Sequence, residues 1–326
     1  MLTGWEAAPE AVRSPPARRD LLSSDELRAL SRRSGLRATA AIARQWAVIV
    51  ATVVVVSRIG TWWAYLIGIV VVATRQHGLA TLVHDGAHHL LYRNHRANDV
   101  ASDVLLAFPL YVSTRLYRRH HLVHHRLLNT PEDPDLDVVS VTRTRRDWVL
   151  IALGDLTGIN LVKVVGTAGE FSMLALLGKG GREARAWLGR GQLVGFAVYL
   201  AALVTVIVLT GTWHLYLLLW IVPSLTVLNF IFRLRSVAEH VACATDEEFN
   251  ASRTVLANVV ERWLFAPCNI NYHLEHHLFP GVPHHNLRRL RRRLVQNPDY
   301  GRRGTTCTSY VFGADSVLAA VLRAGS

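Results

Sequence analysis

Nine of the sixteen histidines in this 326-residue chain fall in three short clusters. The clusters read HDGAHH from His84, HLVHH from His121 and HLEHH from His273. Residues three and four positions apart lie on one face of a helix, so each cluster can direct two or three imidazoles at one point. Neutral imidazole is the commonest side-chain metal ligand. Eight or nine converging histidines exceed the three or four protein ligands of one catalytic metal ion, so the clusters predict two ions.

The composition indicates that these clusters belong to a membrane protein. The chain carries a net charge of +12, yet 51% of its residues are hydrophobic and its mean hydropathy is +0.22. That combination is typical of an integral membrane protein whose basic loops face the cytoplasm. The polar N-terminal stretch lacks the apolar segment of a signal peptide. We therefore expect residues 1–40 to form a cytoplasmic tail, with a short helix from Leu27 to Leu36.

Four apolar stretches are long enough to cross a bilayer, which needs roughly 20 helical residues. The turn at Gly60, next to two tryptophans, suits the outer membrane surface. The predicted outer turns hold only Arg58, whereas the inner segments hold nearly all other arginines. This bias predicts an all-α integral membrane protein with four transmembrane helices in two hairpins, both termini inside, and a cytoplasmic helical cap carrying the histidine clusters. The predicted spans are Ala41–Ser57, Thr61–Ala80, Gln192–Thr210 and Trp213–Phe232.

The segments between the spans are expected to lie at the inner membrane surface. Val100–Val112 is apolar but short, and Trp148–Leu177 has charged residues spaced through apolar ones, so both suit an interfacial position. All histidines except His214 fall on the inner side of this topology. We therefore expect residues 41–300 to form one membrane domain with a shared site, and residues 301–326 to form a C-terminal tail.

The residues around the clusters resemble those of a known family. Asn98-Asp99 follows the first cluster, the sequence DPD follows the second from Asp133, and the third lies within NYHLEHHLFP. A further histidine, His240, stands between the last span and the third cluster. Together these features resemble the three histidine boxes of the integral-membrane fatty acid desaturase and hydroxylase superfamily, and the likeness runs over residues 84–294.

The resemblance implies a non-haem di-iron centre that uses O2 to remove hydrogen from an unactivated C–H bond. Imidazole alone suits iron, zinc, copper and nickel, so the residues themselves do not name the metal. One departure is Ser236, which stands where some acyl-CoA desaturases have an asparagine. We assign as metal ligands His84, His88, His121, His124, His125, His240, His273, His276 and His277.

A second set of residues stands beside the assigned ligands. Carboxylates there can accept the other imidazole N–H and fix the tautomer of a ligand, although Asp133 and its neighbours also suit ordinary turn chemistry. In a helix His89 points about 100° away from His88. Candidates for coordination or for contact with a ligand are Asp85, His89, Asp135, Glu239 and Glu275. We expect His77, His95, His120, His284 and His285 to lie outside the ligand set.

Desaturation with O2 needs two external electrons, and the chain has no motif that would supply them. It lacks a cysteine set for an iron–sulfur cluster, a GxGxxG fingerprint and the His-Pro-Gly-Gly motif of a fused cytochrome b5. We therefore expect a separate donor such as a ferredoxin with its reductase. The expected substrate is a membrane lipid or an acyl-carrier conjugate. The basic run 288–293 suits anionic lipid headgroups better than nucleic acid, so we expect no nucleic-acid partner.

Two alternative functions stay open at this point. A hydroxylase or ketolase of a lipid, carotenoid or natural product shares the first hydrogen abstraction, and sub-ångström positioning decides between the outcomes. A membrane metal-binding or transport protein would place polar ligands near the middle of the membrane. The two clearest spans carry no acidic residue, which argues against transport. The Arg, Ala and Val content suggests a bacterial source, so we expect the inner membrane, with the active site on its cytoplasmic face.

Overall fold

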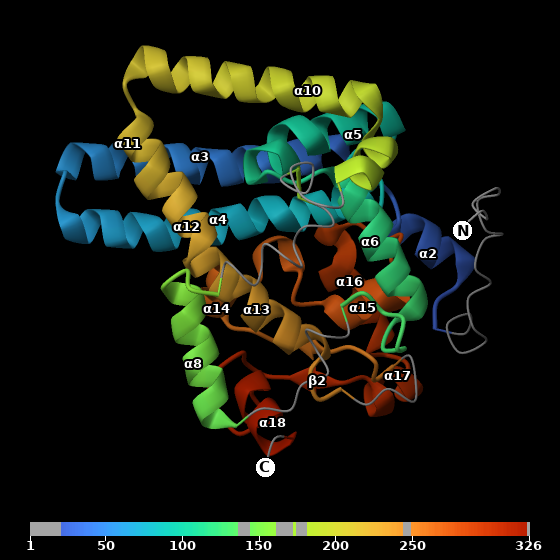
Figure 1. The fold of residues 1–326 in the computed structure, drawn as a ribbon. Helices are drawn as coiled ribbons and strands as arrows, with labels where there is room; N and C mark the ends of the chain where they lie inside the picture. Colours follow the sequence, from blue (N-terminus) through green and yellow to red (C-terminus); the bar gives the residue numbers. More distant parts are fainter. Residues whose placement is uncertain (1–20, 136–143, 161–171, 174–180, 244–248, 325–326) are drawn as a thin grey trace.

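The structure is a computed structural model that describes residues 21–135, 144–160, 172–173, 181–243 and 249–324. It is mostly helical, and four of its helical segments are long and apolar enough to cross a membrane (Figure 1). The predictions of a helical fold and of four candidate spans are confirmed, whereas the pairing into hairpins and the cytoplasmic position of the cap stay predictions. The candidate spans are Gly35–Ile59, Trp62–Ala87, Arg185–Thr210 and Trp213–His240.

The first two spans are the helices α3 (Gly35–Ile59) and α4 (Trp62–Ala87). They run in opposite directions side by side (Figure 1). Between them Gly60 adopts φ +67°, a left-handed conformation that costs glycine little, and its N–H donates to the Val56 carbonyl at 2.9 Å. Helix α4 continues seven residues past the predicted end at Ala80. It does so because neighbouring elements bury the polar residues of its last turns and supply hydrogen-bond partners for several of these residues.

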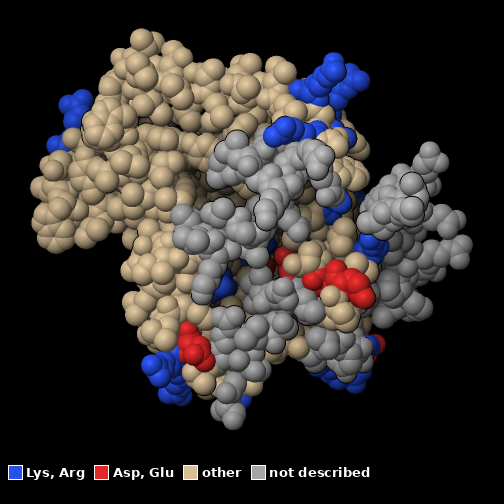
Figure 2. Space-filling model, viewed as in Figure 1, with Lys and Arg blue, Asp and Glu red and all other residues tan. Residues whose placement is uncertain are grey.

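The third span belongs to α10 (Gly181–Thr210), which lies along the outside of the molecule (Figure 1). Only 6% of the most apolar 18-residue stretch of this span is buried, and Val208 and Leu209 are 71% and 80% exposed. An apolar surface this large is rare on a protein surrounded by water, and a bilayer would cover it. Figure 2 shows the same division, since the middle of the surface over α3, α4 and α10 is free of charge, with basic residues only toward its two ends.

The fourth span is a helical rod that crosses α4 obliquely (Figure 1). It departs from regular geometry in the middle, at a π-helical turn and at Thr226, whose φ and ψ are −124° and −92°. Pro223 lacks a backbone N–H, which accounts for part of this irregularity. The rod ends at His240, eight residues past the predicted end. Its segments are α11 (Trp213–Tyr216), η5 (Leu217–Ile221), α12 (Val222–Leu225) and α13 (Val227–His240).

The remaining elements form a body at one end of the spans (Figure 1). The segment predicted to be interfacial at Val100–Val112 contains the end of one helix, a π-helical turn and a 3-10 turn. Of the segment predicted at Trp148–Leu177, residues 161–171 and 174–177 lie outside the described residues. The elements are α2 (Ser24–Leu30), α5 (His95–Ser102), η1 (Asp103–Ala107), η2 (Phe108–Leu110), α6 (Thr114–Leu127), α8 (Arg145–Leu156), β1 (Thr254–Val255), α14 (Val259–Phe265), η6 (Pro267–Asn269), α15 (His273–Leu278), α16 (His284–Leu294), α17 (Pro298–Arg303), β2 (Thr306–Cys307) and α18 (Val317–Ala324).

Both predicted tails contain elements that pack on this body. Leu30 of α2 lies in one apolar cluster with Leu287 of α16, and Asn286 donates to the Leu30 carbonyl at 2.7 Å. In the other tail, Cys307 and Val317 share an apolar cluster with the end of α13. Strands β1 and β2 pair in parallel. The division at residues 40 and 300 stays a prediction about domains, but packing continues across both boundaries.

Candidate metal centre

The fold brings the nine assigned histidines together from four helix segments. The last turn of α4 holds His84, and His88 caps its C-terminus. Helix α6 supplies the second cluster, α15 supplies the third, and α13 ends at His240. All nine are buried or half-buried.

Ring nitrogens of these histidines form two adjacent groups. In the first group, one nitrogen from each of five rings lies within 4.8 Å of all the others. The Nε2 atom of His125 is 3.0 Å from that of His121 and 3.0 Å from that of His276. The first group is His84, His88, His121, His125 and His276.

The second group holds the other four histidines. Nitrogens of His124, His240 and His277 lie within 4.8 Å of one another. The Nε2 atom of His273 is 3.0 Å from that of His240 and 2.9 Å from that of His277. The centroids of the His125 and His277 rings are 4.4 Å apart, so the two groups are in direct contact.

Helix geometry explains how the clusters divide between the groups. Residues four positions apart are separated by about 40° around a helix, and residues three apart by about 60° in the opposite sense. The pair His121 and His125 accordingly shares the first group, and the pair His273 and His277 shares the second. The remaining histidine of the second box, His124, belongs to the second group. The remaining histidine of the third box, His276, belongs to the first group.

The residues present fit two metal ions. Two ligands about 2.1 Å from one ion and at right angles lie about 3.0 Å apart, which matches the Nε2 spacings. Both ring nitrogens of His84 and Nε2 of His88 are buried without a hydrogen-bond partner among the described residues, as are Nδ1 of His240 and of His273. Each unpaired buried polar atom costs about 1–3 kcal/mol, which a bound ion would offset where the atom faces it.

Six of the nine histidines have pKa values that their surroundings lower, which keeps them neutral at pH 7. Burial lowers the pKa of His88 to about 3. Burial, and then the neighbouring imidazoles, lower the pKa values of His121 and His276 well below the ordinary 6.5. The same causes lower the pKa values of His125, His273 and His277. Neutral imidazoles can coordinate a cation at pH 7 without first releasing a proton.

Carboxylates orient two histidines of the second group. Asp133 accepts a hydrogen bond from Nδ1 of His124 at 2.8 Å, and Asp135 lies 3.5 Å from the same atom. Glu239 lies 3.4 Å from Nδ1 of His273 and is held by Arg235 at 2.6 Å. With Nδ1 of His124 engaged, the lone pair of its Nε2 faces the other nitrogens of the group. Asp135 also contacts His120 at 2.9 Å.

Three other predicted candidates face away from the two groups. The carboxylate of Glu275 bonds to Thr254, to Arg291 at 2.8 Å and to Tyr300 at 2.6 Å. Asp85 lies 3.9 Å from His84 but accepts from Nδ1 of His284 at 2.6 Å, which ties α4 to α16. The backbone of His89 turns to φ +55°, and its ring stacks on His95 at 4.2 Å. Among the described residues, none of the three joins a histidine group.

Sequence reasoning missed the residue that joins the first two boxes, Arg118. Its guanidinium donates to the carbonyls of Ala87 at 2.7 Å and Gly86 at 3.0 Å, and pairs with Asp99 at 2.5 Å. A cation here satisfies the carbonyl end of α4. The signal was available, because Arg118 stands one helical turn before His121.

Gly86 allows a close approach between helices at the first box. A Cβ atom there would lie 2.2 Å from Oγ of Ser102, so α5 could not pack at this distance against any other residue. Ser102 in turn hydrogen-bonds Thr114 at 2.8 Å, at the start of α6. Asn98 donates to the Gly86 carbonyl at 2.9 Å, which gives a structural role to the Asn-Asp pair after the first box.

The asparagines near the site do not replace the residue absent at Ser236. Asn229 donates to the Leu225 carbonyl of its own helix. Asn269 accepts from Arg262 and donates to the His284 carbonyl. The nine histidines are thus the nitrogen donors that the described part of the chain brings into the two groups.

Comparison with known proteins agrees with this geometry. The model of the family described as "Fatty acid desaturase" matches residues 60–310, a range that holds all nine histidines. The chain is also similar to the dihydrorhizobitoxine desaturase of Bradyrhizobium elkanii, with 29% identity over 274 residues. That similarity covers 80% of this chain and 76% of the relative.

Proposed function

Because the chain belongs to the fatty acid desaturase family, we propose that this membrane oxidoreductase is an O2-dependent di-iron enzyme that introduces a C=C bond into an aliphatic chain. The observation that carries the proposal is the division of nine histidines into two adjacent groups. The first group would hold one iron ion and the second the other. Bound iron would supply the O2 and electron-transfer chemistry that no side chain here can supply.

The residues of the chain would prepare this centre rather than react themselves. Burial keeps the imidazoles neutral, so the irons would retain more positive charge than in a carboxylate-rich site such as the di-iron bundles. Asp133 would fix the tautomer of His124, and Glu239 lies close to Nδ1 of His273. Arg118 would hold the first two boxes together.

The position of the site supports a membrane-borne substrate. The histidine groups lie at the end of apolar helices, so an aliphatic chain could enter from the bilayer. We propose the cytoplasmic face of a bacterial inner membrane and a separate electron donor such as a ferredoxin with its reductase. The arginine bias and the lack of electron-carrier motifs support these two proposals.

One observation favours a second candidate substrate class. The relative named above is a dihydrorhizobitoxine desaturase, and that name does not mention a fatty acid. A natural product is therefore a second candidate for the molecule that this chain desaturates. Hydroxylation or ketone formation on the same scaffold would leave the histidine groups unchanged, so the product has to decide between these reactions.

Mass spectrometry of lipids and small metabolites tests the proposal. A host supplied with a ferredoxin system would express the wild type, His276→Ala, or His214→Ala as a matched control at an exposed position outside both groups. We expect a product lacking two hydrogens with the wild type and the control, and none with His276→Ala. A product with one added oxygen would show a hydroxylase instead. A product that persists in His276→Ala would refute the metal centre.

A further inference from the structure

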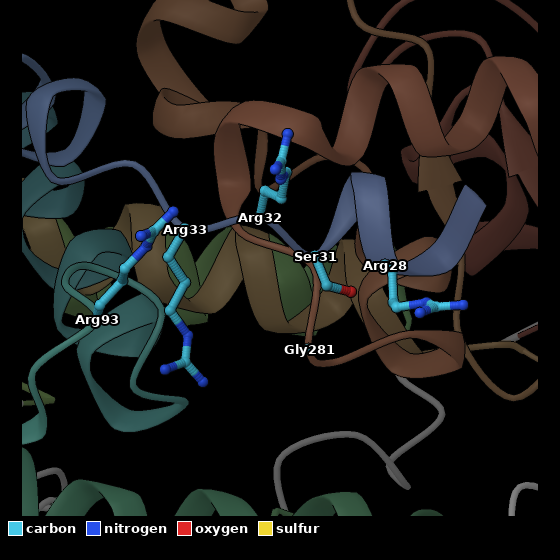
Figure 3. A pocket seen from close by; sticks show the side chains of 6 residues that line it. All are labelled: Arg28, Ser31, Arg32, Arg33, Arg93 and Gly281. Atoms are coloured by element: carbon cyan, nitrogen blue, oxygen red, sulfur yellow. The ribbon is translucent and has the colours of Figure 1, made fainter. Parts of the chain in front are cut away.

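A shallow pocket of about 440 Å³ lies apart from the histidine groups, where three chain segments meet (Figure 3). The segments are α2 with the linker to α3, the loop after the first box and the loop before α16. The volume falls within the roughly 300–1,000 Å³ of ligand sites. The lining residues are Arg28, Ser31, Arg32, Arg33, Arg93 and Gly281.

The pocket concentrates positive charge that the described residues do not neutralise. Only Arg28 has a carboxylate partner among them, Asp25 at 2.6 Å, and both of these side chains are exposed. By contrast, Arg118 and Arg291, which join helices, have the carboxylates of Asp99 and Glu275 as partners. Arg33 and Arg93, which have no carboxylate partner among the described residues, favour an anion at this hollow, and their forked N–H groups match phosphate oxygens.

The pocket lies at the depth of lipid headgroups. Helix α3 has 25 residues and is about 37 Å long, whereas the hydrocarbon core is about 30 Å thick. About 7 Å of α3 therefore extends into the headgroup layers. Arg33 comes two residues before α3, and Arg93 follows the end of α4 at the same end of the pair. Leu36, in the first turn of α3, is 83% exposed, as expected of a side chain that faces lipid.

We propose that this pocket binds the phosphate of an anionic phospholipid of the surrounding membrane. Figure 3 shows Arg33 and Arg93 on one side of the hollow, whereas the side chain of Arg28, beyond Ser31, extends away from them. A phosphate would therefore be held mainly by Arg33 and Arg93. The bound lipid would connect α2 to the loop at Gly281. That loop leads three residues later to His284, which bonds Asp85 beside the first box.

Lipid binding to the full-length protein in detergent tests this proposal independently of catalysis. Delipidated protein would be titrated with phosphatidylglycerol or phosphatidylcholine and followed by native mass spectrometry. The test variant is Arg33→Gln with Arg93→Gln. The control is Arg145→Gln with Arg146→Gln, which removes the same charge from exposed positions of α8, outside both the pocket and the basic run 288–293.

We expect phosphatidylglycerol to bind the test variant about 30-fold more weakly than the wild type, and the control less than about threefold more weakly. Phosphatidylcholine should bind weakly to all three proteins, and added salt should weaken the specific binding. Thermal unfolding without lipid would verify that both variants fold. Equal binding of phosphatidylglycerol by the two variants would overturn the proposal. So would displacement of the bound lipid by millimolar inorganic phosphate, because the ligand would then be a soluble anion.

Discussion

Replacing Asp133 with asparagine tests how the second histidine group is built. The Asp133 side chain is fully buried, and its Oδ1 accepts from Nδ1 of His124 at 2.8 Å and from the Asp135 N–H at 2.9 Å. Its Oδ2 accepts from the Asn129 N–H at 2.9 Å. Burial alone would raise the pKa of Asp133, but these hydrogen bonds and His124 lower it below its ordinary value, so the group is a carboxylate at pH 7.

An amide has one acceptor oxygen where the carboxylate has two. In Asp133→Asn that oxygen can keep the bond to His124 only if the NH2 group faces the Asn129 N–H, donor against donor. Loss of a carboxylate behind a metal-binding histidine typically costs 10–100-fold in metal affinity, or about 1.4–2.7 kcal/mol. We therefore expect the affinity of the second group for its ion to fall by that factor, and the affinity of the first group to change much less.

Metal content under competition from a graded chelator provides the assay. Wild-type protein should hold two ions per chain. Asp133→Asn should release one of them at a free chelator concentration about 10–100-fold lower than the wild type requires. Asp155→Asn is a matched control, because Asp155 is equally buried but pairs with Arg233 away from both groups. If Asp133→Asn keeps both ions with wild-type affinity while folding normally, the proposed control of the His124 tautomer is wrong.

Four further expected outcomes test other parts of the structure. Because burial lowers the pKa values of His88 and His276 far below 6.5, Co2+ affinity should change less than about threefold from pH 7.5 to 6.0, whereas four ordinary imidazoles would lose about 200-fold. The unfolded chain takes up those protons first, so the metal-free protein should lose stability as the pH falls below 6.5, and pH-independent melting would contradict this. Arg118→Ala should lower the free energy of unfolding by about 2 kcal/mol and weaken metal binding by the first group. Arg118→Lys should partly restore both quantities, as measured by thermal unfolding and metal content. Unchanged metal binding in Arg118→Ala would show that Arg118 does not support the site. His77 is fully buried, and both of its ring nitrogens lack a hydrogen-bond partner among the described residues. His77→Leu should therefore preserve activity and raise the free energy of unfolding by about 1–3 kcal/mol. Loss of product in a folded His77→Leu protein would mean that His77 contacts the substrate.

Several features of the fold could be predicted because they depend on local periodicity. A run of apolar residues long enough to span a bilayer reads directly as a helix, and four such runs predicted four candidate spans. Their ends were less predictable. Helix α4 runs on to Ala87 through polar residues, and α13 runs on to His240, because contacts with distant segments bury those turns. A hydropathy pattern contains no information about such contacts.

The histidines show the same division. Spacing alone predicted that each cluster directs two or three imidazoles at one point, because residues three and four apart share a face of a helix. It did not show that His121 pairs with His125 or that His273 pairs with His277. His124 lies in a different group from His121 and His125, and His276 lies in a different group from His273 and His277. This division depends on how α6 and α15 are oriented relative to each other.

From its sequence alone, this chain could be predicted to hold three histidine clusters at the ends of apolar helices, and nine histidines could be named as candidate metal ligands. Which carboxylate contacts which histidine depends on the tertiary structure. Glu275 lies inside the third box yet turns toward Arg291 and Tyr300, whereas Asp133 lies outside any box yet bonds to His124. The physical reason is that a buried carboxylate pairs with the nearest donor in space, and packing between distant segments sets that distance.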